Sequence, residues 1–327
     1  YLKRKNDFED VSNIPKSLKK YFEENFIIDS LSVAKHQKAT DSTIKFLFKL
    51  QDGKSIESVL IPGKQKNEAH KYTLCVSSQV GCSFHCEFCA TGKLKFERNL
   101  QTSEILDQLF LGEKLSGEKI SNIVFMGMGE PLVNYDNVVK AVRILTDFKT
   151  KIIHPEKITI STVGIVPKIF QLADEKLNVK LAISLHATTD VLRNKLIPSA
   201  AKWNMKLLLE ALEYFYKKSK LPLTYEYIML DDVNDSLDDA KRLAKFARRV
   251  SSKVNLIPFN DISFTHPKGF AKQLKSSPMR KVQLFRDILK ELDIEVFVRT
   301  PSGTDIDAAC GQLAFSEKKT KLDSLFP

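Results

Sequence analysis

The chain has 327 residues, of which 43% are hydrophobic, and its 51 Lys and Arg against 40 Asp and Glu give a formal net charge of +11. Its apolar content suffices for a large core, and neither an uncharged run of membrane-spanning length nor an apolar signal segment is evident. Five cysteines are too few for a secreted disulfide scaffold, so we expect an enzyme of the reducing cytoplasm. The positive charge favours an anionic partner, nucleic acid before an acidic membrane surface.

The first 70 residues differ from the rest of the chain in their pattern of polar and apolar residues. A polar, lysine-rich segment from Pro15 to Asn25 predicts a helix. Residues 43–50 and 55–61 then alternate like two strands of a hairpin around Asp52-Gly53. We interpret residues 1–70 as a small accessory region and residues 71–327 as the core.

The core shows a repeated alternation of strand and helix. Strands are predicted at 73–78, 123–126, 158–161, 179–185, 225–229 and 254–258, and helices at 103–115, 136–148, 165–176, 203–218, 236–250 and 278–292. Strands separated by helices run parallel, and right-handed crossovers let six such units curl. We therefore predict an α/β fold with a partial (βα)6 barrel, because a full barrel needs eight units.

Three cysteines follow the first predicted core strand at CxxxCxxC spacing, namely Cys82, Cys86 and Cys89. Three thiolates in one tight loop fit a four-iron cluster, whose usual set is four cysteines, so one iron is left for a ligand that is not protein. Zinc is the alternative, because His85 could complete a Cys3His tetrahedron. Structural zinc usually joins two separated knuckles, which favours the cluster.

Small and polar residues stand where the predicted strands end, which is where a barrel of this kind places its ligand site. They are the cysteine loop, Gly127 to Glu130, Ser161, Ser184-Leu185-His186 and Asn260. Each has a simpler interpretation. Gly127-Met128-Gly129 is compatible with a plain tight turn and lacks the full dinucleotide fingerprint, and an isolated histidine such as His186 more often packs in a core.

Several motifs together resemble a known family. They are residues 73–82 (TLCVSSQVGC), Cys86 and Cys89, residues 127–132 (GMGEPL) and residues 305–313 (DIDAACGQL). They resemble the radical S-adenosylmethionine (SAM) dual-specificity RNA methyltransferases, which modify C2 of an adenine in large-subunit ribosomal RNA. The resemblance covers nearly the whole chain from Phe8 onward, so we expect the chain to begin inside the helical amino-terminal domain of that family.

The resemblance implies a substrate, cofactors and partners. The substrate would be adenine 2503 of 23S ribosomal RNA, with adenine 37 of transfer RNA as a second target. A [4Fe-4S] cluster would be held by Cys82, Cys86 and Cys89. SAM would be bound by Gly129, Glu130, Ser161, Ser184, Leu185, His186 and Asn260. The enzyme would act as a monomer, would not use a membrane, and would receive electrons from a donor such as flavodoxin.

The same resemblance implies a mechanism through the two remaining cysteines. Cys310 would take a methyl group from one SAM, and a 5′-deoxyadenosyl radical from a second would remove a hydrogen from it. The methylene radical would attack C2 and tether the RNA to the enzyme. Cys75 would help to remove the C2 proton and form a disulfide with Cys310. Glu57 matches the proton acceptor, although a glutamate beside a strand is more often a surface charge.

Two other functions stay open at this point. The first is methylation at C8 of the same adenine. Val80, Pro131 and Pro258 favour C2 over C8. The second is a non-catalytic RNA-binding protein stabilised by a cluster, which would need neither Cys75 nor Cys310. The sequence also departs from the family at Gly63 and at Ser302, where an acidic residue and an arginine are common. Arg98, Arg299 or Lys93 would replace the charge of that missing arginine.

Overall fold

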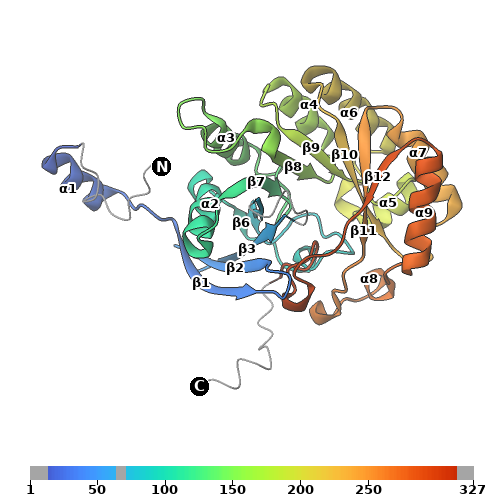
Figure 1. Cartoon of the computed structure of the whole chain (residues 1–327), viewed down its shortest axis with the longest axis horizontal. Helices are drawn as coiled ribbons and strands as arrows, with labels where there is room; N and C mark the ends of the chain where they lie inside the picture. The colour runs from blue at the N-terminus through green and yellow to red at the C-terminus, as the bar shows by residue number, and fades with distance from the viewer. Residues whose placement is uncertain (1–13, 64–70, 315–327) are drawn as a thin grey trace.

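A ten-stranded sheet forms the centre of the molecule, with its strands in the order β1-β2-β3-β4-β7-β8-β9-β10-β11-β12 (Figure 1). The computed structural model describes residues 14–63 and 71–314. Phe8, where the family resemblance begins, lies outside the described residues, as do 64–70 and 315–327, which belong to the predicted accessory and core regions.

Seven neighbouring strands of the sheet run parallel. They are β4 (Tyr72–Cys75), β7 (Ile120–Phe125), β8 (Ile158–Thr162), β9 (Lys180–Ser184), β10 (Leu223–Met229), β11 (Ser252–Pro258) and β12 (Glu295–Val298). The helices between them are α2 (Thr102–Ser116), α3 (Tyr135–Thr146), α4 (Val166–Asp174), α6 (Met205–Ser219), α7 (Leu237–Ala247) and α9 (Met279–Glu291). In Figure 1 these helices surround the strands. The six predicted units are confirmed.

The sheet ends in two edges, β1 and β12, within the described part of the chain, so the barrel is partial, as predicted. The interior strand β10 is buried at all seven positions, as expected for a parallel strand covered on both faces. A charged residue, Glu226, lies within this strand and accepts a hydrogen bond from the Asn255 side chain at 2.9 Å. A buried carboxylate at the centre of a sheet is a polar feature that the core alone does not require.

The amino-terminal strands continue the same sheet. β1 (Leu31–Lys38), β2 (Ile44–Leu50) and β3 (Ser55–Pro62) are antiparallel, and β3 pairs with β4 so that Val59 lies opposite Cys75. The helix predicted at Pro15 to Asn25 is α1 (Lys16–Asn25). A domain boundary near residue 70 stays a prediction.

Among the elements that were not predicted from the sequence are β1, β12 and α5 (Asp190–Leu196). β1 is a mostly exposed edge strand that contains two lysines and a histidine, and its polar sequence hides the pairing with β2. β12 has four residues, and α5 has seven, so neither is long enough to show a periodic pattern. No helix among the described residues has the length and apolar character to span a bilayer.

Candidate active site

One cavity at the carboxyl ends of the parallel strands collects most of the predicted site residues. Its lining includes Cys82, Cys86, Cys89, Gly129, Glu130, Ser161, Ser184, His186 and Cys310. The three cysteines lie on the loop that follows β4 and joins the two short paired strands β5 (Gln79–Val80) and β6 (Arg98–Asn99). The loop folds tightly on itself, because a Cβ added at Gly92 would lie 2.8 Å from the carbonyl oxygen of Cys86. Glycine at position 92 thus permits the cysteines to gather.

The spacing of the thiols distinguishes between a cluster and a single ion. In the described part of the chain, Cys82, Cys86 and Cys89 form no group whose ligand atoms all lie within 4.8 Å of one another. A zinc ion bound at about 2.3 Å would hold its sulfurs at about 3.8 Å from each other. His85 is exposed and does not line the cavity, and its Nδ1 lies 3.1 Å from the carbonyl oxygen of Gly92. This donor set fits a cluster in which each cysteine binds its own iron, and it does not fit Cys3His zinc.

The thiols also need a metal or a cation to ionise. Burial raises the pKa of Cys82 to about 12 and raises the pKa values of Cys86 and Cys89. Metal ligands must be thiolates, so iron would have to replace the protons. The positive charge of Arg193 also favours the thiolate of Cys86, because it lowers the pKa of that thiol.

The glycine turn places a carboxylate inside the cavity. Gly129 has a φ of +98°, and a Cβ there would lie 2.5 Å from Cβ of Gln79, so only glycine fits. Glu130 follows, and its two carboxylate oxygens accept the backbone N–H groups of Val163 at 2.9 Å and Leu132 at 3.0 Å. Burial raises the pKa of Glu130 to about 7, although these hydrogen bonds oppose the shift. The turn is therefore tight, as the simpler interpretation held, and it also presents a functional group.

The next strand ends supply hydroxyl groups and an imidazole. Ser161 and Ser184 line the cavity from β8 and β9, whereas Leu185 is fully buried beside them. Burial lowers the pKa of His186 to about 3, so the ring is neutral. Its Nδ1 accepts the N–H of Ile228 at 3.1 Å, which leaves the proton on Nε2. His186 is thus buried and also lines the cavity.

The carboxy-terminal cysteine loop is hydrogen-bonded to the cluster loop. The carbonyl oxygen of Gly311 accepts the N–H of Ala90 at 2.7 Å, and Thr91 donates its hydroxyl to the carbonyl oxygen of Leu313. Asn260 does not line the cavity, but its side-chain amide donates to the carbonyl oxygen of Cys310 at 3.0 Å. The first two bonds join residues more than 200 positions apart, and all three hold the loop of Cys310 at the cavity.

Cys75 lies at the end of β4, buried close to Cys310. Burial raises the pKa of Cys75 to about 12, and the charge of Cys310 adds to this rise. Arg299 lowers the pKa values of both thiols, so the guanidinium acts on the pair. All five cysteines are free thiols in the structure, and the disulfide between Cys75 and Cys310 stays a prediction.

Glu57 is buried, so its interpretation as a surface charge was wrong. The carboxylate lies 3.4 Å from Nζ of Lys45, and both side chains are less than 5% exposed. Its backbone N–H donates to Sδ of Met128 in the glycine turn at 3.3 Å. Glu57 is two positions from Val59, the β3 residue opposite Cys75, and it does not line the cavity.

Three charged residues at the cavity were missed or only partly anticipated. Arg299 and Glu226 line it, with Nη1 of Arg299 at 3.7 Å from Oε2 of Glu226. Arg98 and Lys93, the other candidates for the missing charge beside Ser302, pair with acidic side chains instead. Arg193 is fully buried on α5. The only sequence feature that could have indicated a role for Glu226 is a charged residue within an apolar strand. Arg193 lies in none of the motifs that the sequence analysis identified.

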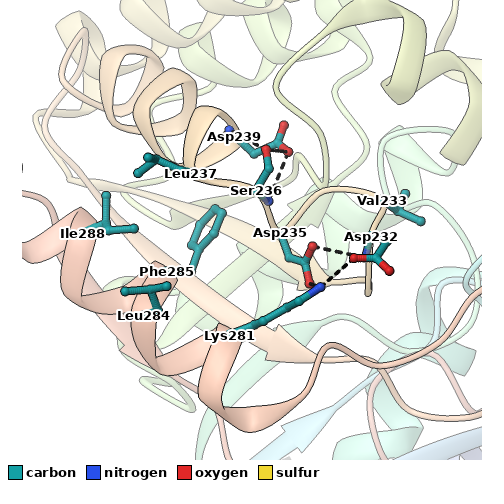
Figure 2. A pocket seen from close by; sticks show the side chains of 10 residues that line it. All are labelled: Asp232, Val233, Asp235, Ser236, Leu237, Asp239, Lys281, Leu284, Phe285 and Ile288. Atoms are coloured by element: carbon teal, nitrogen blue, oxygen red, sulfur yellow. Dashed lines mark hydrogen bonds and ion pairs between the residues drawn. The ribbon is translucent and has the colours of Figure 1, made fainter.

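A second hollow lies between α7 and α9 (Figure 2). Asp231, Asp232 and Asp235 form a compact acidic group here, but Nζ of Lys281 lies 2.7, 2.6 and 3.5 Å from their carboxylate oxygens. The lysine thus occupies the place that a metal ion would take. This hollow shares no lining residue with the cysteine cavity.

Comparisons with known proteins agree with this geometry. Residues 76–247 match the family model of the radical SAM superfamily. The chain is 43% identical over 318 residues to a "Probable dual-specificity RNA methyltransferase RlmN" from Christiangramia forsetii, covering 96% of this chain and 87% of that protein. It is also 43% identical over 326 residues to a "Dual-specificity RNA methyltransferase RlmN" from Nautilia profundicola, covering 97% and 90%. A radical SAM methyltransferase structure from Sphaerobacter thermophilus superposes with a TM-score of 0.85 at 36% identity, covering 94% and 88%.

Proposed function

The chain belongs to the RlmN-type radical SAM RNA methyltransferases, and from that premise we propose that it methylates C2 of an adenine in 23S ribosomal RNA, with transfer RNA as a second substrate. The observation that carries the proposal is the pair of thiols outside the cluster loop. Cys310 lines the cavity, Cys75 lies behind it, and Arg299 acts on both. A protein that only bound RNA would need neither thiol.

The cavity residues divide into those that hold the cluster and those that hold SAM. Cys82, Cys86 and Cys89 would bind three irons. The two carboxylate oxygens of Glu130 are held by backbone N–H groups, and they would accept a hydrogen bond from the amino group of SAM. Ser161, Ser184 and His186 would orient the rest of the SAM molecule. When bound, these groups supply a 5′-deoxyadenosyl radical by one-electron cleavage of SAM. The protein's part is to orient the reactants and exclude water.

Cys310 is suited to carry a methyl group. Its sulfur must be a thiolate to accept one, and Arg299 opposes the effect of the surrounding protein, which raises the pKa of the thiol. The hydrogen bonds to Asn260 and from Ala90 fix its loop against the cluster loop. The methyl group would therefore lie where the radical is produced.

Cys75 and Glu57 would take part in the release of the product. Only the thiolate of Cys75 would take up a proton from C2 of the tethered base, and Arg299 favours this form because it opposes the rise of the Cys75 pKa that burial causes. Once the adduct has returned one electron to the cluster and the Cys75 proton has passed on, the Cys75 sulfur would attack the Cys310 sulfur. The bond between that sulfur and the methylene carbon would break with its electron pair on the carbon, which would take a proton and leave as the methyl group of the RNA. Glu57, held by Lys45 on the neighbouring strand, would accept the proton further from the cavity.

The target adenine has to leave its stack to reach this site. The reactive groups lie at the carboxyl ends of the strands, and a base inside a helix would not approach them, so the substrate is single-stranded or the base is extruded. The net charge of +11 favours binding to the phosphate backbone, with an affinity that falls as salt is added.

The test is the identity of the methylated nucleoside. Anaerobically reconstituted enzyme is incubated with deuteromethyl-labelled SAM, a reductant, and protein-free 23S ribosomal RNA or transfer RNA, and nucleosides are separated by mass spectrometry. Labelled 2-methyladenosine in both RNAs is the expected result. Labelled 8-methyladenosine would assign the chain to the C8 chemistry instead, and unlabelled RNA would favour a binding role.

A further inference from the structure

Arg193 is a buried cation whose hydrogen-bonding groups are only partly used. Arg193 is 1% exposed, and its Nη2 donates a hydrogen bond to the carbonyl oxygen of Val163. Nε and Nη1 are buried without a hydrogen-bond partner. A guanidinium buried with unused donors costs free energy unless an anion compensates it, so the surroundings of this side chain need an explanation.

The segment that carries Arg193 packs on the cluster loop. The N–H of Glu87 donates to the carbonyl oxygen of Leu196 at the end of α5, at 3.0 Å. The hydroxyl of Ser199, in the following turn, donates to the carbonyl oxygen of Ser83 at 3.4 Å. Both acceptor and donor residues on the cluster loop stand next to its cysteines, so α5 is fixed directly against the metal-binding loop.

The nearest candidate for such an anion is the cluster loop, because α5 and the turn after it are hydrogen-bonded to residues on both sides of Cys86. Burial lowers the pKa of Arg193 to about 10, and the negative charge of Cys86 opposes that shift more than Asp190 does. Asp190 accepts the N–H of Met205 at 2.7 Å at the start of the same helix. His186, the other titratable group that Arg193 affects, is neutral and does not compete for the charge.

We propose that Arg193 is a positioning residue that supplies the internal counter-charge of the iron–sulfur cluster, stabilising the Cys86 thiolate and the reduced state of the cluster. The proposal rests on the proposed cluster site. Reduction adds one electron from an external reductant and makes the cluster more negative by one charge. A cation in a low-dielectric site stabilises that state, and net charge and hydrogen bonds to sulfur are what set the potentials of such clusters.

Two variants separate charge from packing. Arg193→Gln removes the charge but keeps a donor for the carbonyl group of Val163, and Arg193→Lys keeps the charge. Arg143→Met is the matched control, because Arg143 is an exposed arginine that pairs with Glu175 on the surface. Each protein is reconstituted anaerobically, and its iron content and melting temperature are measured first. If the glutamine variant does not fold, Arg193→Met takes its place.

The deciding measurement is a redox titration followed by electron paramagnetic resonance in the absence of SAM, which removes any effect on SAM binding. At the wild-type midpoint we expect the ratio of reduced to oxidised cluster in Arg193→Gln to fall about tenfold, equal to about 59 mV for one electron. Arg193→Lys and Arg143→Met are expected to match the wild type. An unshifted midpoint in the neutral variant, with the cluster intact, would overturn this inference alone. A wild-type protein without a four-iron cluster would overturn the proposed cluster site as well.

Discussion

In the hollow between α7 and α9, the ammonium of Lys281 lies within 3.5 Å of three carboxylates. The cavity at the strand ends is lined by four cysteines and by Glu130, whose pKa is raised by burial, and Arg193 is buried on α5 outside this lining with two unused donors. Both places bring ionisable side chains together. In the first, the chain itself supplies the opposite charge for all three carboxylates. In the second, Arg299 pairs with Glu226 at 3.7 Å, and the three cysteines of the cluster loop are left for a metal.

This difference helps to distinguish a structural cluster of charges from a functional one. A group of carboxylates that a lysine already neutralises needs no further ligand, and its interactions contribute only to the stability of the fold. Buried thiols and a buried guanidinium with free donors reach a favourable state only when a further group joins them. The predictions below test this contrast, from the largest expected effect to the smallest.

Removing one cluster thiol is expected to have the largest effect. Cys86→Ala leaves two of the three cysteine ligands, so iron content is expected to fall from about four per chain to background and RNA methylation to be lost. Iron analysis and visible absorption measure this. Cys310→Ala is the matched control, because that cysteine lies outside the loop, and it is expected to keep its iron while losing activity. Stoichiometric zinc in the wild type, without visible absorption, would contradict the assignment.

The carboxyl group of Glu130 is expected to make stability depend on pH. Its pKa of about 7 in the folded chain exceeds the ordinary value of 4.5, so the native state binds the proton more tightly. The free energy of unfolding is therefore expected to fall as pH rises from about 4.5 to about 7, by about 3 kcal/mol in all. Urea unfolding of the iron-free chain measures it. In Glu130→Gln this loss is expected to disappear, and an identical pH profile in both chains would contradict the burial argument.

The tight turn before Glu130 predicts a smaller loss. Gly129→Ala places a side chain at a φ of +98° and brings its Cβ to 2.5 Å from that of Gln79, so the free energy of unfolding is expected to fall by about 2 kcal/mol or more. Gly53→Ala is the control, because Gly53 has a φ of +81° with no atom within 4 Å. It carries the backbone strain without the close contact. Equal losses in the two variants would show that the contact with Gln79 has no consequence.

The acidic hollow is expected to matter for stability alone. Lys281→Met leaves Asp231, Asp232 and Asp235 in mutual repulsion, so the melting temperature is expected to fall slightly, and the more so at low salt. The rate of RNA methylation is expected to equal that of the wild type. A large loss of methylation in a folded Lys281→Met chain would show that this hollow takes part in function.

The sequence predicted the parallel strands and the convergence of their ends because both follow from local patterns. Apolar runs such as Ile123 to Met126 are readable as strands, and parallel strands necessarily end on one side. The cysteine spacing likewise pointed to a cluster before any geometry was known. β12 and α5 were missed because four and seven residues are too short for a period to show.

The environment of each side chain could not be predicted, because it depends on contacts between distant segments. Nothing around Glu57 in the sequence indicates that Lys45 is its buried partner, and nothing in the α5 sequence shows that this helix is hydrogen-bonded to the cluster loop. The hydrogen bond between Ala90 and Gly311 joins two loops that are adjacent only after folding. Ionisation and burial therefore required the structure.

The measurement that tests the central claim most directly is the fate of RNA in Cys75→Ala. If Cys310 carries the methyl group and Cys75 releases the product, this variant is expected to bind its cluster, methylate Cys310 and then accumulate a covalent adduct of Cys310 with the RNA. After nuclease digestion, intact-protein mass spectrometry would show the mass of the added nucleotide, and peptide mass spectrometry would locate it on Cys310. Normal turnover in Cys75→Ala, with free 2-methyladenosine and no adduct, would contradict the two-cysteine account.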